Sequence, residues 1–180
     1  AKAADQVPHT WAGPEIAVAT TKAFSAQLAA LELLTLCIGK EMGTVSPDEY
    51  YAMAKALTGL PGDVQKVLDV WKNGEMGAFA ARYCSGRPVF YIGPNWDSAL
   101  CLEGSLKLKE IAYLHSEAYP AGELKHGPIS LIQERTLVVA LATSEPLFDK
   151  TMANVREVRA RGADVLCVTL DRLAGNVGEG

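Results

Sequence analysis

The pattern that most constrains the fold is a repeated change, after Arg87, between short apolar runs and helical segments. Three runs with little polar alternation are expected to be strands: RPVFYIG (87–93), TLVVALAT (136–143) and DVLCVTL (164–170). Between them the sequence predicts a helix that carries residues 103–114 and an amphipathic helix at 146–162. Strands without alternation are typical of a parallel sheet that is covered on both faces. Residues 87–171 are therefore predicted to form a β-α-β-α-β unit of an α/β layered domain.

The N-terminal half of the chain has a different pattern, which is helical and contains no complete sheet. We expect a helix from Pro14 to Gly43, because proline suits a first helical position and glycine suits a C-terminal stop. This helix is apolar nearly all round toward its end, which predicts burial or packing at a subunit interface. Residues 14–85 are therefore expected to be the helical trailing edge of another domain.

A second helix is expected to begin at Ser46, because serine followed by Glu49 forms a capping box. Pro61, between Leu60 and Gly62, is expected to end it, and a third amphipathic helix then runs to about Trp71. A short helix over residues 75–84 completes this part of the chain.

Charge and cysteine content argue against several classes of partner. The net charge is −4 and the pI is about 5.4, so we expect neither nucleic-acid binding nor binding to an anionic membrane surface.

The cysteines stand among apolar neighbours, which predicts reduced core thiols in a cytosolic protein rather than disulfides or a metal site. They are Cys37, Cys84, Cys101 and Cys167. No signal peptide or membrane-spanning run is expected, which favours a cytoplasmic location.

A charged stripe marks the helix after the first strand. Glu103, Lys107 and Glu110 stand at i, i+4 and i+7, within an arc of roughly 60°. Apolar residues border this arc on both sides: Leu106, Ile111, Tyr113 and Leu114. One interpretation is a surface helix with an ordinary ion pair. The other is a catalytic carboxylate beside a lysine in a semi-apolar cleft, where burial raises the carboxylate pKa and the cation lowers it.

The segment AGELKHGP (121–128) favours the catalytic interpretation. Its glycines permit close backbone approach to a ligand on either side of Lys125 and His126. Histidine titrates near neutral pH and can pass a proton in either direction.

Two other places are candidate ligand sites. The turn at residues 92–98 leads from a strand end into a helix N-terminus, where ligands bind in open α/β sheets, although it lacks a GxGxxG pattern. Glu15 and residues 17–24 form a polar segment among apolar residues. That segment is either a capped helix with buried threonines or part of a ligand site.

Three longer stretches carry a family resemblance: AGPEIAVATTKAF (12–24), LEGSLKLKEIAYLHSEAYPAGELKHGPISLI (102–132) and VREVRARGADV (155–165). They closely resemble the isomerase half of the glucosamine-6-phosphate synthases, which are glutamine–fructose-6-phosphate aminotransferases. The resemblance covers nearly the whole chain and implies two sugar-isomerase (SIS) domains, each a three-layer αβα fold around a parallel sheet. Residues 1–72 would then be the C-terminal helical part of the first SIS domain with a linker. Residues 73–180 would be a second SIS domain, truncated at its C-terminal end.

The resemblance implies that fructose 6-phosphate and glutamine-derived ammonia become glucosamine 6-phosphate through imine formation and ketose–aldose isomerisation. Glu110 resembles the carboxylate that moves the proton between C1 and C2. Lys107 resembles its partner at the substrate oxygens, and Glu103 resembles the group that orients this lysine. His126 resembles the acid/base that opens the sugar ring. In the family this histidine serves the neighbouring subunit, which implies a homodimer.

Val18 and Thr20 match positions that line the sugar site in this family, where serine is more frequent at the position of Thr20; with Glu15 they are the expected substrate-binding residues. At residues 93–96 the chain departs from the Gly-Arg-Gly-like turn of the family. The Ser/Thr-rich phosphate-binding loop, the lysine-bearing C-terminal tail and the glutaminase domain are expected to lie outside this chain. The fragment alone is therefore expected to be inactive. The implied chemistry needs neither a metal nor an organic cofactor.

Two alternatives share these residue patterns. Another SIS enzyme, such as a deaminase or deglycase that acts on an amino-sugar phosphate, would use the same proton-transfer residues. A non-catalytic SIS module that senses a phosphosugar would tolerate loss of the carboxylate, yet Glu110 is present.

Overall fold

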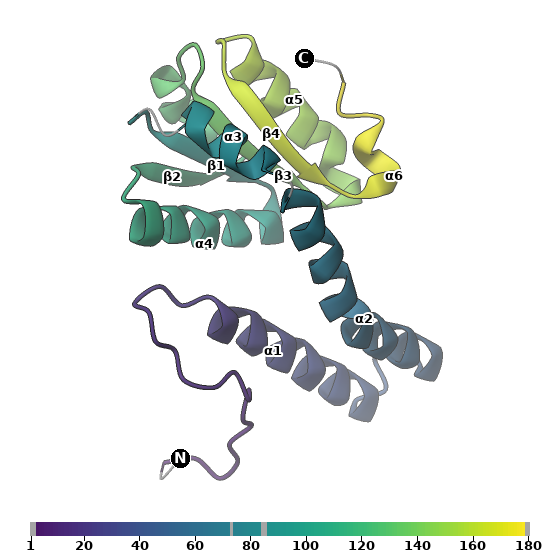
Figure 1. Ribbon diagram of the computed structural model, residues 1–180. Helices are drawn as coiled ribbons and strands as arrows, with labels where there is room; N and C mark the ends of the chain where they lie inside the picture. Colours follow the sequence, from purple (N-terminus) through teal and green to yellow (C-terminus); the bar gives the residue numbers. More distant parts are fainter. Residues whose placement is uncertain (1–2, 73, 84–85, 179–180) are drawn as a thin grey trace. The chain divides into compact units, whose positions relative to one another are not determined.

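The computed structural model describes residues 3–72, 74–83 and 86–178 (Figure 1). The chain divides into two compact units, Ala1–Ala78 and Phe79–Gly180, and each is considered on its own. Asn73, at the expected boundary between the two domains, lies outside the described residues.

The first unit contains helices α1 (Lys22–Glu41) and α2 (Pro47–Trp71). The predicted capping box is confirmed, because the Ser46 hydroxyl accepts from the Glu49 amide and the Glu49 carboxylate accepts from the Ser46 amide at 2.9 Å. The predicted break at Pro61 is wrong, since α2 continues through it. A proline inside a helix removes one backbone hydrogen-bond donor. The helix can continue with a bend at that point, because the hydrogen bonds on either side remain.

Helix α1 begins eight residues later than Pro14, where the sequence predicted its start. Residues 12–20 contain bends and irregular backbone instead. The valine and two threonines of AVATT lose rotamer freedom in a helix, which disfavours an early start. Glu15 then supplies an acceptor for the helix end, because its Oε1 accepts from the Thr21 amide at 2.7 Å. The predicted stop is confirmed, since α1 ends at Glu41 and Gly43 has a φ of 67°.

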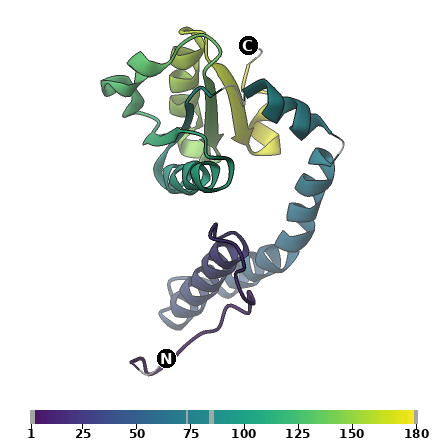
Figure 2. The ribbon, with the colours of Figure 1, turned by 60° about the vertical axis from the view of Figure 1, so that its left-hand side comes forward.

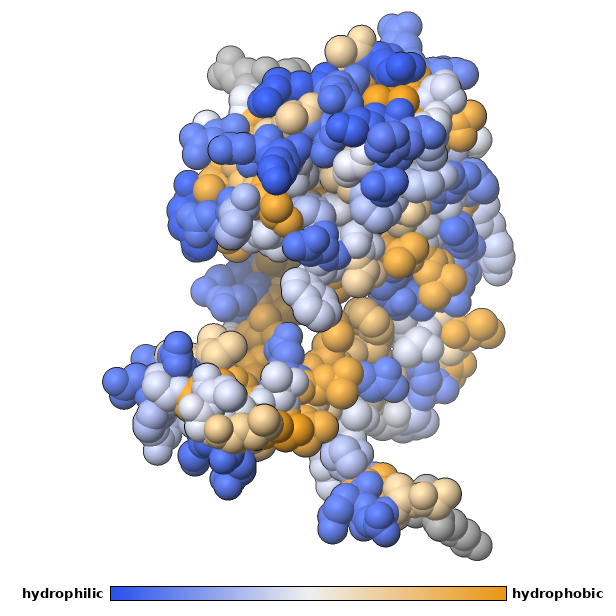
Figure 3. All heavy atoms as spheres, turned by 180° about the vertical axis from the view of Figure 1, so that it is seen from behind, coloured by the Kyte–Doolittle hydropathy of each residue, from blue (hydrophilic) through white to orange (hydrophobic). Residues whose placement is uncertain are grey.

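The predicted burial of α1 is not met within this chain. Leu36 and Gly39 are its buried residues, whereas several leucines and Ile38 are exposed. Figure 3 shows hydrophobic side chains at the surface of this helical unit. By length and composition α1 is also apolar enough to cross a membrane, contrary to the expectation that no such run exists. Core helices of globular proteins meet the same criterion, so the observation is weak by itself.

The second unit is a four-stranded, all-parallel sheet in the order β2-β1-β3-β4. The strands are β1 (Val89–Gly93), β2 (Ser116–Pro120), β3 (Leu137–Ala142) and β4 (Asp164–Thr169). The helices are α3 (Glu75–Tyr83), which starts in the first unit, α4 (Asn95–Ala112), α5 (Phe148–Arg159) and α6 (Asp171–Ala174). The predicted α/β layering with a parallel sheet is confirmed.

Side chains that alternate along the strands divide between two apolar layers. Phe90 and Val138 point to one layer, which also contains Val155 of α5. Val89 and Val139 point to the other layer, which also contains residues of α3 and α4. Figure 2 views α4 nearly along its axis beside the sheet. Both faces are therefore covered, which explains why β1 and β3 are apolar without alternation.

Strand β2 was not predicted from the sequence. Its residues SEAYP are short and mostly polar, so they carry no apolar signal. Backbone pairing with β1 makes it a strand, from Val89 opposite Ser116 to Gly93 opposite Pro120. Its position at the edge of the sheet tolerates this composition.

The cysteines only partly match the expectation of core thiols. Cys101 is buried, and burial raises the pKa of its thiol to about 12. Cys167 is partly buried, and burial also raises its pKa. Cys37 is exposed on α1, so the prediction of a core thiol is wrong for this residue within this chain. Cys84 lies outside the described residues.

Candidate functional site

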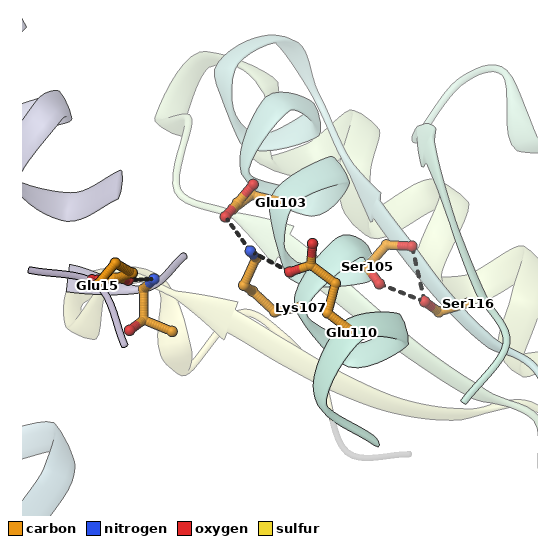
Figure 4. A network of polar contacts seen from close by, with 7 residues as sticks. Glu15, Glu103, Ser105, Lys107, Glu110 and Ser116 are labelled. Carbon is orange, nitrogen blue, oxygen red and sulfur yellow. Dashed lines mark hydrogen bonds and ion pairs between the residues drawn. The ribbon is translucent and has the colours of Figure 1, made fainter. Parts of the chain in front are cut away.

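The predicted charged stripe is present on α4, and Lys107 lies between the two carboxylates (Figure 4). Its Nζ is 2.6 Å from Glu110 Oε2 and 3.4 Å from Glu103 Oε1. The three side chains are 20–28% exposed, so water reaches them but does not surround them. They form one polar cluster at the surface of the helix.

The cluster keeps its lysine charged. The hydrogen bond to Glu110 is the main cause that raises the pKa of Lys107, and Glu103 adds to it, while desolvation acts in the opposite direction. The Glu110 carboxylate, a group that can accept a proton, lies 2.6 Å from this positive charge. The arrangement can therefore supply a general base with a fixed positive charge beside it.

Two close contacts hold α4 against the sheet beneath this cluster. The Ser105 and Ser116 hydroxyls lie 2.9 Å apart, and Ser116 Oγ also donates to the carbonyl of Ser105 at 2.8 Å (Figure 4). Both serines are buried. Gly104 faces the Tyr91 ring so closely that an added Cβ would lie 3.1 Å from it. These contacts set the rotation of α4 about its axis, and hence the direction in which Lys107 faces.

Exposed apolar side chains flank the cluster. Leu102, Leu106, Ile111 and Tyr113 on or next to α4 are all exposed in this chain. Of the predicted apolar borders, Leu106, Ile111 and Tyr113 are thus exposed, whereas Leu114 is partly buried. The cluster lies on an open face of α4.

The AGELKHGP segment folds into two short 3-10 turns, η1 (Leu124–His126) and η2 (Pro128–Leu131). Leu124 is buried and anchors the segment, whereas His126 is exposed. His126 follows the carboxyl end of β2, while Glu110 lies in the last turn of α4, which leads to the amino end of β2. A five-residue strand spans about 13–16 Å, so these two side chains lie near opposite ends of the sheet within one chain.

The turn at residues 92–98 is tied to the core. Asp97 is 3% exposed, and its carboxylate accepts from the Thr143 amide at 2.8 Å and from the Thr143 hydroxyl at 2.5 Å. A Cβ on Gly93 would lie 2.8 Å from the Asp97 Cβ, which explains the glycine. Sequence reasoning marked this turn as a ligand site but missed its partner, Thr143, because the two are 46 residues apart.

The other expected substrate residues lie in the first unit. Glu15 is partly buried, with Oε1 bound to the Thr21 amide and Oε2 4.0 Å from Lys22 Nζ. Thr20 is partly buried, and Val18 is 92% exposed. The hydrogen bond to the Thr21 amide supports the capped-helix interpretation of Glu15. Its buried threonines are not found, because Thr20 is partly buried and Thr21 is exposed.

Sequence reasoning also missed a polar ladder on β2. His115, the residue just before the strand, stands at period two with Glu117 and Tyr119 within it. Both oxygens of the Glu117 carboxylate are hydrogen-bonded, one to His115 Nε2 at 3.1 Å and the other to the Tyr119 hydroxyl. Period-two spacing of polar residues could have indicated it, had β2 been recognised as a strand. Among residues 3–72, 74–83 and 86–178, no group of three side chains is placed to hold a metal ion.

Comparisons with known proteins point to one family. The SIS domain model matches residues 83–174. A glutamine–fructose-6-phosphate aminotransferase (isomerizing) from Caldanaerobacter subterraneus is 51% identical over 164 residues, which are 91% of this chain and 26% of that protein. The corresponding protein of Clostridium tetani is 46% identical over 93% of this chain and 27% of its own length. The chain thus spans about a quarter of the length of these relatives.

Solved structures agree with the sequence comparisons. The C-terminal domain of glucosamine-fructose-6-phosphate aminotransferase from Francisella tularensis has a TM-score of 0.86 and 34% identity, covering 92% of this chain and 46% of that chain. A glucosamine-6-phosphate deaminase from Thermotoga maritima has a TM-score of 0.65 at 24% identity, which shows a shared fold. Since the SIS model covers just over half of the chain, and sequence and structure agree, the chain belongs to the SIS domain family.

Proposed function

We propose that this chain is part of the isomerase half of a glucosamine-6-phosphate synthase, a glutamine–fructose-6-phosphate aminotransferase. The observation that carries the proposal is the Glu103–Lys107–Glu110 cluster on an open face of α4, in a chain 51% identical to an enzyme of that name. The substrate would be fructose 6-phosphate with glutamine-derived ammonia, and the product glucosamine 6-phosphate. Because the chain spans about a quarter of its relatives, the piece alone is expected to lack turnover.

Glu110 is proposed to move the proton between C1 and C2 of the open-chain sugar. Lys107, whose Nζ lies 2.6 Å from the Glu110 carboxylate, would offset the negative charge that develops on the substrate oxygens. Glu103, 3.4 Å from the same lysine, orients it. The cluster thus holds a base and a cation side by side on one helix face, as an enediol-type proton transfer requires.

His126 is proposed to open the sugar ring in the neighbouring subunit of a homodimer. Its exposure, and its position at the other end of β2 from Glu110, support a role at a site that its own chain does not complete. The exposed apolar residues beside the cluster offer a surface for such packing. Val18, Thr20 and Glu15 are proposed to line the sugar site from the first unit.

The domain assignment is part of the same proposal. Residues 1–72 would be the helical end of a first SIS domain with its linker, and 73–180 a second SIS domain, in which the match at 83–174 lies. A glutaminase domain of the parent chain would supply ammonia, in line with the word glutamine in the names of the relatives. A cytoplasmic location is proposed as well, because the substrates are phosphorylated metabolites.

The test is Glu110→Gln in the full-length enzyme. Positioned proton transfer contributes roughly 10²–10⁴-fold, so glucosamine 6-phosphate formation should fall by about that factor while fructose 6-phosphate binding persists. Solvent-deuterium exchange at C1 should fall in parallel. Glu157→Gln, an exposed residue of α5, is the matched control and should leave turnover unchanged. Turnover of the Glu110 variant within about threefold of wild type would overturn the assignment.

A further inference from the structure

A cavity that contains none of the charged-cluster residues lies at the amino ends of the strands. Its volume is about 360 Å³, and its walls come from the segment before β1, the start of β2 and the loop before β3. These segments are far apart in the sequence and meet because parallel strands share their amino ends. Pockets of about 300 Å³ or more can hold a small organic ligand.

One wall of the cavity is the ladder of β2. Glu117 accepts from the Tyr119 hydroxyl and interacts with His115 Nε2, and these contacts lower its pKa, the tyrosine most. The negative charge of Glu117 is therefore compensated on both oxygens. The carboxylate binds Nε2, and Nδ1 of His115, which has no hydrogen-bond partner among the described residues, can donate to an anion when the ring is protonated.

The segment before β1 contributes a cation, Arg87. Arg87 Nη1 donates to the carbonyl of Glu134, which anchors the guanidinium at the cavity. A guanidinium has five N–H groups, so most of its donors remain for another acceptor. Arg87 thus supplies free donors to the cavity, whereas Pro88 and exposed Leu131 supply an apolar surface.

We propose that this cavity binds a small organic anion. The oxyanion would lie against Arg87, beside His115, and an apolar body would lie against Pro88 and Leu131. Arginine binds carboxylate and phosphate oxygens in a bidentate manner, so both classes of oxyanion fit. This site shares no residue with the charged cluster on α4 and goes beyond the proposed isomerase function.

The test uses the 180-residue chain with three probes of similar shape: benzoate, phenyl phosphate and neutral benzamide. Binding is measured by calorimetry and by amide chemical-shift changes in NMR spectra. At least one of the two anions should bind. Binding should change the amide chemical shifts of residues 115–119 and 131–136. Benzamide should bind at least about tenfold more weakly. The stronger anion identifies whether the site prefers carboxylate or phosphate.

Substitutions separate this site from general charge effects. Arg87→Gln should weaken anion binding at least tenfold, whereas Arg156→Gln, which removes an equal charge from the exposed face of α5, should not change it. The amide spectrum of each variant shows whether it is folded. The proposal is overturned if benzamide binds as well as the anions, if both arginine variants behave alike, or if the shifts map to α4 instead. Absence of binding by both anions at concentrations up to about 10 mM also overturns it.

Discussion

Replacing Gly93 with alanine tests how closely α4 must approach β1. The added Cβ would lie 2.8 Å from the Asp97 Cβ and 2.9 Å from the Asp97 backbone carbon. Carbon atoms prefer about 3.5 Å or more, so the first turn of α4 must move by roughly half an ångström. Overpacking of this kind costs about 1–3 kcal/mol.

The movement also disturbs the two hydrogen bonds, of 2.8 and 2.5 Å, that Thr143 donates to the Asp97 carboxylate. Weakening a hydrogen bond to a buried carboxylate costs about 1.5–3 kcal/mol. Together the two effects predict a loss of about 3–5 kcal/mol in the free energy of unfolding of the second unit. That is a large share of the roughly 5–15 kcal/mol that stabilises a typical domain.

The assay is native-state hydrogen exchange at the amides of Val138 and Ala140, which are fully buried on the central strand β3. Their exchange should become at least about 100-fold faster in Gly93→Ala. Gly122→Ala is the matched control, because no atom lies within 4 Å of its added Cβ. It should be neutral or stabilising by about 0.4–1 kcal/mol. Equal exchange rates in the two variants would refute the close approach as the reason for Gly93.

Two further predictions concern buried groups of the second unit. In a double-mutant cycle, Ser116→Ala should lower the free energy of unfolding by about 1–2 kcal/mol, because it leaves the Ser105 hydroxyl without its partner. Adding Ser105→Ala should then cost little more. Additive losses in urea unfolding would contradict this coupling. The pKa of the Cys101 thiol rises from its ordinary value of 9.0 to about 12, so its contribution to stability is present below pH 9 and is lost between pH 9 and 12. Wild type should therefore lose stability over this range more steeply than Cys101→Ala. In the folded chain, thiol reagents should label exposed Cys37 well before Cys101. Equal labelling rates would contradict the burial of Cys101.

Local patterns in the sequence determined much of the second unit. Strands β1, β3 and β4 and helices α4 and α5 follow from apolar runs and helical periodicity, and their parallel arrangement follows from the lack of alternation. The stripe on α4 was equally predictable, because residues at i, i+4 and i+7 of a helix share a face wherever that helix packs. Its ion pairs are contacts within one helix.

Elements that depend on partners distant in sequence were not predictable. Strand β2 has no apolar signal and exists because β1 offers it backbone hydrogen bonds. Helix α1 begins beside the Thr21 amide, which donates to the Glu15 carboxylate, and not at Pro14.

The sequence by itself therefore determined the secondary structure with strong periodicity, the fold class and the residues of the charged cluster. Tertiary structure alone decided that Asp97 binds Thr143, that Ser105 meets Ser116, and that His126 lies near the opposite end of β2 from Glu110. The physical reason is that helical neighbours are set by a repeat of 3.6 residues. Contacts between strands, turns and helices depend instead on which distant segments the packed sheet brings together.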